Sequence, residues 1–255
     1  MAASRSRDLV GCSLPWPELG EAAPAALQTQ LSAWLGPGGA GVVRAMDADF
    51  HACWFATHQV GLPQDVAAAV PKRQREYFYG RVCARAAVRR LREGFDGAIP
   101  AGADRRPVFP AGLEGSISHS DELAVAVCRS AERGRLGVDV ERIMAKAVAS
   151  ELEHAIAHPA ELELAGWGAL PHRLRLTLIF SAKEALFKAI WPDVRRHAEL
   201  LASAVVDVAP GWLCLEVRQD FPGGWTAGRR VAARWGRCGP EVLTLVSLEQ
   251  KDVNS

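Results

Sequence analysis

The run LGVDVERI, residues 136–143, places two acidic side chains inside an otherwise apolar segment. Side chains two positions apart on a strand share a face, so Val138 and Val140 are predicted to enter the core. Asp139 and Glu141 then share the opposite face. Ionised carboxylates are almost never buried without a partner, so this strand must lie where something neutralises the two acids.

Two interpretations of these acids fit the sequence. A divalent cation such as Mg²⁺ takes oxygen ligands and commonly uses one or two carboxylates beside substrate phosphates. Alternatively, the strand lies at a sheet edge with its polar face in water, where the acids pair with Arg135 or Arg142. The strand by itself leaves both interpretations open.

Length, composition and charge narrow the class of protein. The 255 residues are 49% hydrophobic, which is enough to bury one large core or two smaller ones. Lys and Arg total 30 against 29 Asp and Glu, so no overall basic field favours nucleic acid or an anionic membrane, and any anion site must be local. The first residues resemble neither a secretory signal nor a membrane anchor, no later run predicts a spanning helix, and the cysteines form no close pair. We therefore expect a cytoplasmic protein with reduced cysteines and with no nucleic-acid or membrane partner.

The first part of the chain predicts two helices and a strand. A weak helix is expected within residues 17–36, followed by a strand that begins near residue 42. A longer amphipathic helix is expected over residues 71–95. Residues 122–128 and 131–143 are predicted to form a β-hairpin.

The second part repeats the order of helix and then strands. A largely helical stretch is predicted from residue 145 to 191, closed by Pro192. Strand candidates follow at 204–209, 212–218, 224–235 and 241–249. These patterns predict an α+β fold of two roughly equal halves, which we place at residues 1–123 and 124–255.

The segment FSAKEALFKAIW, residues 180–191, holds two opposite charges four positions apart. On a helix Glu184 and Lys188 share a face, in the order that favours an ion pair. Ser181 and Glu184 also have the spacing of a capping box. The apolar run before them, however, favours a helix that begins near Pro171, which would place Ser181 inside it.

A histidine and several basic side chains are further candidates. SISHS, residues 116–120, surrounds His119 with hydroxyls just before a predicted strand. Such a histidine is commonly a hydrogen-bonded structural residue, yet imidazolium and hydroxyl groups are also good phosphate donors. Each of the basic residues, taken alone, is typical of a solvated surface charge: Lys72, Arg73, Arg81, Arg105 and Arg106.

In order and spacing, these segments together resemble the 4'-phosphopantetheinyl transferases, in particular the larger Sfp-type class that includes the enterobactin-synthase enzymes. The matching motifs are Arg106-Pro107, SISHS, GVDVE at 137–141, KEALFK at 183–188 and the YGRVCAR region around Gly80. The resemblance is strong over residues 70–192 and looser at both ends. It departs from the family pattern at Phe180, where the helix motif usually has Trp.

The resemblance implies transfer of the 4'-phosphopantetheine arm of coenzyme A to a serine of an apo acyl or peptidyl carrier protein, with release of adenosine 3',5'-bisphosphate. It implies two similar halves related by a pseudo-twofold axis, each a helix on a small antiparallel sheet, with the active site in the cleft between them. The amino-terminal half would contact the coenzyme A phosphates, and the carboxyl-terminal half would hold magnesium and the catalytic residues. This class is typically monomeric.

Carried over by position, the resemblance implies that Asp139, Glu141 and Glu184 bind Mg²⁺ and that Glu184 takes the proton of the serine. Lys188 would stabilise charge on the diphosphate, with Lys183 assisting nearby. The implied contacts to coenzyme A phosphates are Lys72, Arg73, Arg81, Arg106, Ser118 and His119.

Two other functions fit the same residues. The first alternative is a non-catalytic protein that binds coenzyme A or a carrier protein, and it has no use for a candidate base. The second is an Mg²⁺-dependent hydrolase of a nucleotide pyrophosphate, which needs no protein-docking surface. The identity of the acceptor, whether a peptide, polyketide, fatty-acid or siderophore carrier, is not contained in these motifs.

Overall fold

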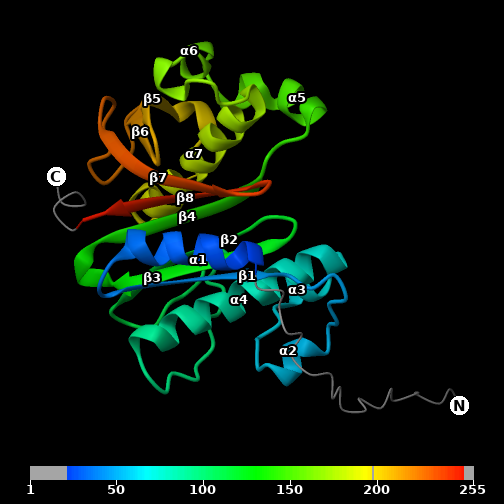
Figure 1. Ribbon diagram of the computed structural model, residues 1–255. Helices are drawn as coiled ribbons and strands as arrows, with labels where there is room; N and C mark the ends of the chain where they lie inside the picture. The colour runs from blue at the N-terminus through cyan, green and yellow to red at the C-terminus, as the bar shows by residue number, and fades with distance from the viewer. Residues whose placement is uncertain (1–21, 197, 250–255) are drawn as a thin grey trace, which may run out of the picture.

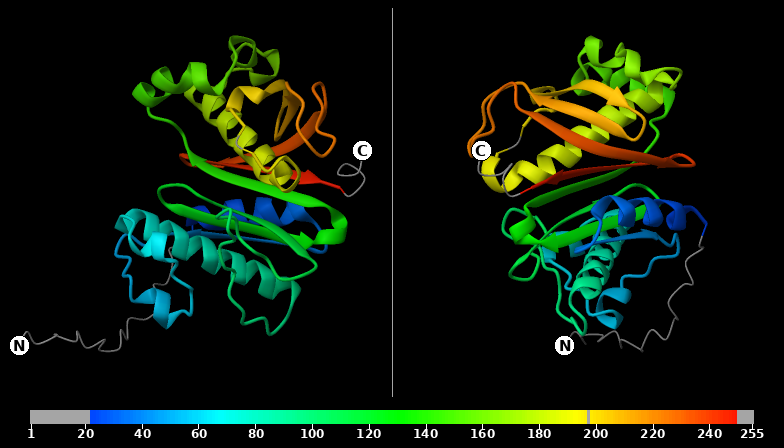
Figure 2. Two further views of the ribbon diagram at one scale, coloured as in Figure 1. Left: turned by 180° about the vertical axis from the view of Figure 1, so that it is seen from behind. Right: turned by 60° about the vertical axis from the view of Figure 1, so that its left-hand side comes forward.

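Two antiparallel sheets, each covered on its outer face by one long helix, form the two halves of the chain (Figure 1). The computed structural model describes residues 22–196 and 198–249. The sheets face each other in the middle of the molecule, with the long helices α4 (Pro71–Leu91) and α7 (His172–Val194) on opposite outer sides (Figure 2). The predicted α+β fold of two halves is confirmed.

The amino-terminal half contains the smaller sheet. Its three strands have the order β1-β3-β2. The strands and the other helices of this half are β1 (Gly39–Ala45), β2 (Leu113–His119), β3 (Leu123–Ser130), α1 (Ala22–Leu35), α2 (Trp54–Thr57) and α3 (Gln64–Ala67). Side chains alternate along β3, so Ala124 and Ala126 pack under α4 while Val125 and Val127 face the other half.

The carboxyl-terminal half contains a sheet of five strands in the order β4-β8-β7-β6-β5. Its strands are β4 (Arg135–Arg142), β5 (Ser203–Ala209), β6 (Trp212–Val217), β7 (Arg230–Cys238) and β8 (Glu241–Leu248). Besides α7 it has the helices α5 (Lys146–Ile156) and α6 (Pro159–Leu162), and the 3₁₀ turns η1 (Ala131–Arg133), η2 (Ala165–Trp167) and η3 (Leu200–Ala202).

A separate hydrophobic core joins the two sheets. Val138 and Val140 of β4 are fully buried there, packed with β3, β8 and α1, as the alternation along β4 predicted. The acidic face of β4 therefore points away from this core.

The predicted hairpin between residues 122–128 and 131–143 is wrong. Both edges of β3 are taken by β1 and β2, so β4 passes through η1 into the other sheet and pairs with β8. A division after residue 123 would separate β3 from its two partners. We propose that the boundary between the halves lies at η1 instead.

Most of the other predicted elements appear with shifted ends. The helix over residues 71–95 ends at Leu91, and the helical stretch contains α5, α6 and α7. Pro192 lies inside the last turn of α7 and does not close it, which corrects the predicted end. The strand predicted to begin at residue 224 begins at Arg230. Residues 17–21 of the first predicted helix lie outside the described residues.

Within the described residues, no helix combines the length and apolar character needed to cross a membrane.

Candidate active site

The two halves meet where the edge strands β2 and β4 lie side by side. The backbone N–H of Val138 donates to the Ser116 hydroxyl at 3.1 Å, so a side chain supplies the acceptor that a neighbouring strand would otherwise provide. Two residues further along β2 and one residue further along β4, the Ser118 hydroxyl donates to Asp139 Oδ1 at 2.8 Å. The SISHS and GVDVE motifs therefore face each other across the junction of the halves.

Helix α7 reaches this junction because it packs directly on the backbone of β4. A Cβ atom at Gly137 would lie 1.8 Å from the carbonyl oxygen of Ala185, so no other residue fits at this crossing. One turn further on, Lys188 Nζ lies 2.6 Å from Asp139 Oδ1 and 2.9 Å from Ser118 Oγ. The glycine of the GVDVE motif thus sets the distance between the helix and the acidic strand.

Asp139 is the centre of these contacts. Its side chain is 3% exposed, and Oδ1 accepts hydrogen bonds from both Ser118 and Lys188. Oδ2 is also buried, but within residues 22–196 and 198–249 it has no hydrogen-bond partner. A buried carboxylate oxygen without a donor is costly, and a bound cation would remove that cost.

The neighbouring acids add negative charge on the same side of β4. Burial first, and then the charge of Asp139, raise the pKa of Glu141 from its usual 4.5 to about 8, with further contributions from Glu184 and Glu241. No group of three or more His, Cys, Asp or Glu side chains arranged to hold a metal ion is found among the described residues. The acids are thus close enough to repel one another but do not by themselves form a closed metal cage.

This charge arrangement predicts that the metal-free protein becomes less stable as the pH rises. A carboxyl group whose pKa is raised in the folded state stabilises the fold fully below its usual pKa of 4.5, and that stability is lost as the pH rises through about 8. Glu141→Gln imitates the protonated form and is expected to flatten this loss. Melting temperatures from about pH 5 to about pH 9 measure this loss of stability. An equal slope in Glu141→Gln and in the exposed control Glu151→Gln would contradict the prediction.

A cleft of about 340 Å³ opens beside this junction. Glu184, Lys188 and Trp191 of α7 line one side, and the loop that carries Arg105 and Arg106 lines the other. Trp191 Nε1 donates to Asp104 Oδ2 at 3.2 Å and so ties the loop to the helix. Burial lowers the pKa of Arg106, which places its guanidinium at the partly desolvated wall of the cleft.

A smaller cavity of about 130 Å³ adjoins the cleft, which we call the α4-start cavity; Arg105, Pro107 and Ile117 line both. Its remaining wall is made by α4 and the end of β2, through Arg73, Glu76, Tyr77, Gly80, Arg81 and His119. Three arginines and one histidine therefore surround a space large enough for a phosphate group.

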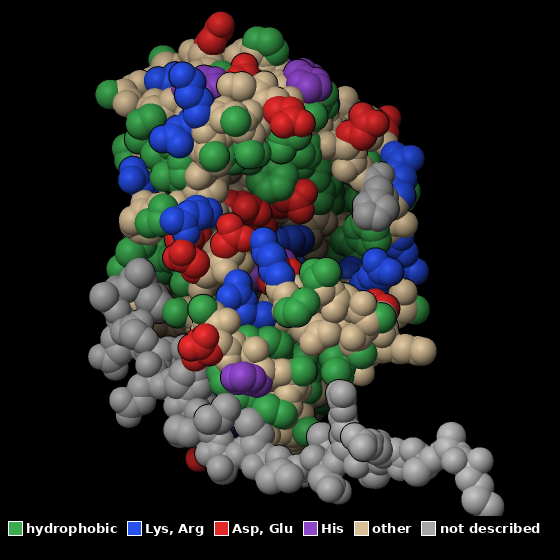
Figure 3. Space-filling view, turned by 90° about the vertical axis from the view of Figure 1, so that its right-hand side faces the viewer, with side chains coloured by type: hydrophobic (Ala, Val, Ile, Leu, Met, Phe, Trp, Pro, Cys, Tyr) green, Lys and Arg blue, Asp and Glu red, His purple; other side chains and the backbone are tan. Residues whose placement is uncertain are grey.

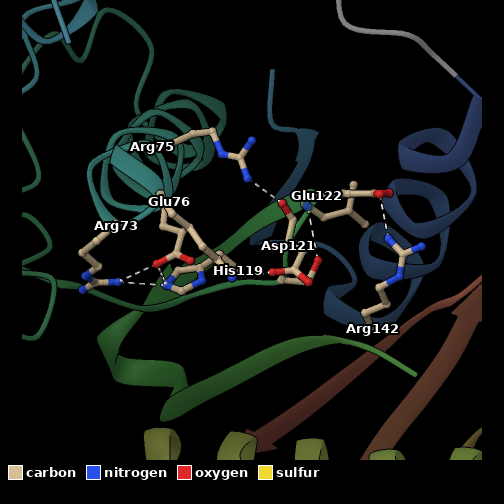
Figure 4. A network of polar contacts seen from close by, with 10 residues as sticks. Arg73, Arg75, Glu76, His119, Asp121, Glu122 and Arg142 are labelled. Atoms are coloured by element: carbon tan, nitrogen blue, oxygen red, sulfur yellow. Dashed lines mark hydrogen bonds and ion pairs between the residues drawn. The ribbon is translucent and has the colours of Figure 1, made fainter. Parts of the chain in front are cut away.

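The Glu76 carboxylate contacts two of these cationic groups, Arg73 and His119 (Figure 4). Its Oε2 lies 3.3 Å from Arg73 Nη1 and 3.7 Å from His119 Nε2, and the Arg73 and His119 nitrogens lie 3.1 Å apart. Burial lowers the pKa of His119, and the Glu76 carboxylate opposes that change. The buried acid thus holds the arginine and the imidazole side by side at the cavity wall.

Lys72 lies outside both cavities. Its ammonium is exposed and pairs with Asp121 at 2.6 Å, in the turn between β2 and β3. The same turn is held by Arg75, which donates to the Asp121 carbonyl at 2.9 Å, and by Arg142, which pairs with Glu122 at 2.6 Å (Figure 4). Lys72, Arg75 and Arg142 therefore hold the turn between β2 and β3.

Lys183 is not brought to the cleft, which corrects its expected role. Its side chain is fully buried, and Nζ donates to Glu161 Oε2 at 2.9 Å and to the Ile156 carbonyl at 2.8 Å. Consecutive helical residues are turned by about 100° from each other, so Lys183 faces the core of the carboxyl-terminal half while Glu184 faces the cleft. Lys183 thus connects α7 to α6 through a buried ion pair.

Four other predicted residues lie in or beside the cleft. Arg106, Glu184 and Lys188 line the cleft, and Lys188 Nζ donates to the Ser118 hydroxyl at 2.9 Å. Sequence reasoning missed three buried acids: Glu76 and Glu241 near the site, and Glu161 beside Lys183. The i, i+3 spacing of Arg73 and Glu76 was the available signal for Glu76, but it is equally typical of a surface ion pair.

Charged and apolar side chains also form separate groups on the surface at the junction of the halves (Figure 3). Acidic side chains gather at the level where the two halves meet, with Lys and Arg side chains beside them (Figure 3). A group of hydrophobic side chains lies directly above the acids on the same face (Figure 3). Anionic, cationic and apolar parts of a ligand would each find a complementary region here.

Comparison with protein families gives two matches that together span most of the described chain. The family described as "4'-phosphopantetheinyl transferase N-terminal domain" matches residues 62–129. The family described as "4'-phosphopantetheinyl transferase superfamily" matches residues 135–228. The two matches meet at η1, between β3 and β4.

Individual proteins are similar over most of their length. Enterobactin synthase component D of Salmonella typhi is 36% identical over 203 residues, which is 78% of this chain and 83% of that protein. The 4'-phosphopantetheinyl transferase Svp of Streptomyces mobaraensis is 34% identical over 190 residues, which is 72% of this chain and 75% of that protein. Enterobactin synthase component D of Escherichia coli (strain K12) is 44% identical over a shorter stretch of 119 residues, 46% of this chain and 55% of that protein.

Proposed function

The chain belongs to the 4'-phosphopantetheinyl transferase superfamily, and we propose that the cleft between its halves is where the arm of coenzyme A passes to the carrier protein. It is a transferase that moves phosphopantetheine from coenzyme A to carrier proteins. The observation that carries the proposed site is the meeting of Ser118, Asp139 and Lys188, which come from β2, β4 and α7. Of these three, Lys188 lines the cleft.

We propose Asp139, Glu141 and Glu184 as the protein ligands of Mg²⁺. Two observations favour a divalent cation at this place. Asp139 Oδ2 is buried without a donor among the described residues, and burial together with the charge of the neighbouring acids raises the pKa of Glu141. Because Mg²⁺ keeps several waters and takes substrate phosphates as ligands, a few carboxylates without a closed cage fit this ion. A bound Mg²⁺ would neutralise charge on the diphosphate and polarise its phosphorus–oxygen bonds.

The side chains of the cleft supply the remaining chemistry. The hydroxyl of the carrier serine attacks the phosphorus that bears pantetheine, and the bond from that phosphorus to the bridging oxygen breaks, which releases adenosine 3',5'-bisphosphate. Glu184 takes the proton of the serine hydroxyl, directly or through water. Lys188 donates from its ammonium to the diphosphate and stabilises the charge on the leaving group.

The cationic residues are proposed to hold the nucleotide end. Arg106 faces the cleft, and Arg73, Arg81 and His119 surround the α4-start cavity, which suits the 3'-phosphate. Lys72 would contribute to holding the nucleotide from outside the two cavities. Phe187, Ile190 and Val194 supply an apolar wall on the α7 side of the cleft, which suits the pantetheine arm.

His119→Ala is expected to weaken coenzyme A binding about tenfold, because it removes one charge-assisted hydrogen bond to a phosphate. The rate at saturating coenzyme A should change little, since the imidazole is not proposed to take part in the proton transfer. Calorimetry with coenzyme A measures the affinity, and single-turnover transfer measures the rate. An unchanged affinity, or a lost rate at saturation, would show that His119 has another role.

We propose the exposed face of α5 as the place where the carrier protein docks. Val148 and Leu152 lie one turn apart on this helix and are 43% and 40% exposed. Carrier proteins are in general acidic and helical, so basic residues near the cleft would complement them. The names of the relatives suggest a carrier of secondary metabolism, such as that of a siderophore, peptide or polyketide synthase.

Both sides of the cleft come from one chain, so we propose that the enzyme works as a monomer. The direct test is the intact mass of an apo carrier protein after incubation with the enzyme, Mg²⁺ and coenzyme A. The expected result is a mass gain of one phosphopantetheine arm, together with adenosine 3',5'-bisphosphate in equal amount. Cleavage of coenzyme A without modification of the carrier would favour the hydrolase, and binding without either product would favour a non-catalytic protein.

A further inference from the structure

A second cavity continues along α4 beyond the α4-start cavity. This α4 pocket has a volume of about 240 Å³ and includes Val60, Leu62, Tyr77, Arg81, Arg85 and Ile99 in its walls. Tyr77 and Arg81 also line the α4-start cavity, so the two cavities adjoin. The residues at positions 73, 77, 81 and 85 are spaced four apart, so they form one stripe about 18 Å long on the helix.

The α4 pocket contains positive charge without an internal counter-charge. Arg81 is 7% exposed, its Nε is buried without a hydrogen-bond partner, and its guanidinium lies 4.6 Å from the centre of the Tyr77 ring. Neither Arg81 nor Arg85 forms an ion pair or hydrogen bond with another residue of the described ranges. Burial lowers the pKa of Arg85, and no described residue that lines the pocket is acidic.

Two neighbouring arginines without an acidic partner are unfavourable unless an anion binds beside them. Two like charges one helical turn apart destabilise a helix, and a buried guanidinium without an acidic partner loses much of its hydration. The α4-start cavity reaches Arg81 but not Arg85. A phosphate held there would therefore leave Arg85 without a counter-charge.

The walls of the α4 pocket indicate the body of the ligand. Two loops, residues 60–63 and 98–101, contribute Val60, Leu62 and Ile99 together with prolines and alanines. Apolar walls give no advantage to a hydrated inorganic ion but stabilise an apolar body attached to the anionic group. A cavity of about 150 Å³ is sufficient for benzene, so this larger one can hold a single ring with its carboxylate.

We propose that the α4 pocket binds a small organic carboxylate with a single-ring or similarly sized apolar body, its carboxylate held between Arg81 and Arg85. This site is additional to the transferase cleft. Because Arg81 is shared with the proposed coenzyme A contacts, an anion in the α4 pocket competes for the same guanidinium and lowers the affinity for coenzyme A. The bound carboxylate thus acts as an inhibitor of coenzyme A binding.

Calorimetry with sodium benzoate on the full-length protein tests this proposal, with sodium phosphate as the ion that lacks an apolar body. Benzoate is expected to bind with one-to-one stoichiometry and more tightly than phosphate. Arg85→Met should weaken benzoate binding at least about tenfold, as expected for loss of a charge-assisted hydrogen bond. The matched control Arg90→Met removes an arginine of α4 that does not line the pocket and should leave benzoate binding unchanged.

A second variant fills the pocket without changing its charge. Ala98 is exposed at the pocket wall, and Ala98→Phe should also abolish benzoate binding. Benzoate should raise the KM for coenzyme A in the wild type and not in Arg85→Met. Equal benzoate binding by wild type and Arg85→Met, no binding to the wild type, or tighter binding of phosphate would overturn the proposal. Benzoate binding is measured without a carrier protein. Its result therefore does not depend on whether the transferase assignment is correct.

Discussion

Asp139→Asn is expected to lower the rate of phosphopantetheine transfer by on the order of 10³-fold, because it removes the charge around which the site is built. The amide keeps the shape of the side chain and can still accept the hydrogen bond from Ser118. It no longer neutralises Lys188, whose Nζ lies 2.6 Å from Asp139 Oδ1, and it is a poor ligand for Mg²⁺. The fold should be retained, because the core that joins the sheets lies on the other face of β4.

Single-turnover transfer to a carrier protein, followed by intact mass, measures this loss at saturating coenzyme A. Asp207→Asn makes the same chemical change at an exposed position of β5 and serves as the matched control. Circular dichroism establishes that both variants are folded. A rate for Asp139→Asn within a few-fold of the control would remove Asp139 from the catalytic site.

Glu184→Gln is expected to reduce transfer by about 10²- to 10⁴-fold, the range for loss of a general base. Glu184 lines the cleft on α7, whereas the cationic residues proposed for the nucleotide end lie on α4, on β2 and in the loop before Pro107. Coenzyme A binding should therefore change much less than the rate. The base also predicts a pH–rate profile that rises with deprotonation in the wild type and is flatter in the variant.

The two measurements together separate a base from a structural residue. Calorimetry gives the coenzyme A affinity of Glu184→Gln, and stopped transfer reactions at several pH values give its profile. The exposed Glu163→Gln is a matched control on the same half of the chain. If Glu184→Gln kept the wild-type profile with a uniformly lower rate, Glu184 would be a metal ligand without a role in proton transfer.

The sequence was most informative where a local pattern decides the structure. Alternation along residues 136–143 correctly placed Val138 and Val140 in the core and the two acids on the other face. The apolar run after Pro171 correctly placed Ser181 inside α7, where its hydroxyl lies 2.8 Å from Thr244 Oγ1. Both outcomes depend on the periods of strands and helices, which the residues themselves reveal.

The errors arose where pairing between distant segments decides the structure. Segments β3 and β4 follow each other closely and read as a hairpin, but β8, about a hundred residues later, is the partner of β4. The same pairing brings Glu241 beside the acids of β4, and no local pattern contains that neighbour. Contacts of this kind follow from the topology of the whole sheet.

Lys183 shows why a motif does not define a site by itself. The two lysines of KEALFK are five residues apart, so they lie on different sides of the helix. Lys188 lies over β4, and Lys183 lies in the core beside Glu161. Burial lowers the pKa of Lys183, and the Glu161 carboxylate opposes this change. The partner that explains Lys183 lies on α6, outside the motif.

We propose that carboxylates from β4 and α7 hold one divalent cation beside the diphosphate of coenzyme A at the junction of the halves. A crystal structure with coenzyme A and Mn²⁺ in place of Mg²⁺, with anomalous scattering measured at the manganese edge, tests it directly. We expect a single anomalous peak in contact with Asp139, Glu141 or Glu184 and with an oxygen of the diphosphate. A fully bound coenzyme A whose diphosphate lies away from these acids, with no manganese peak among them, would contradict it.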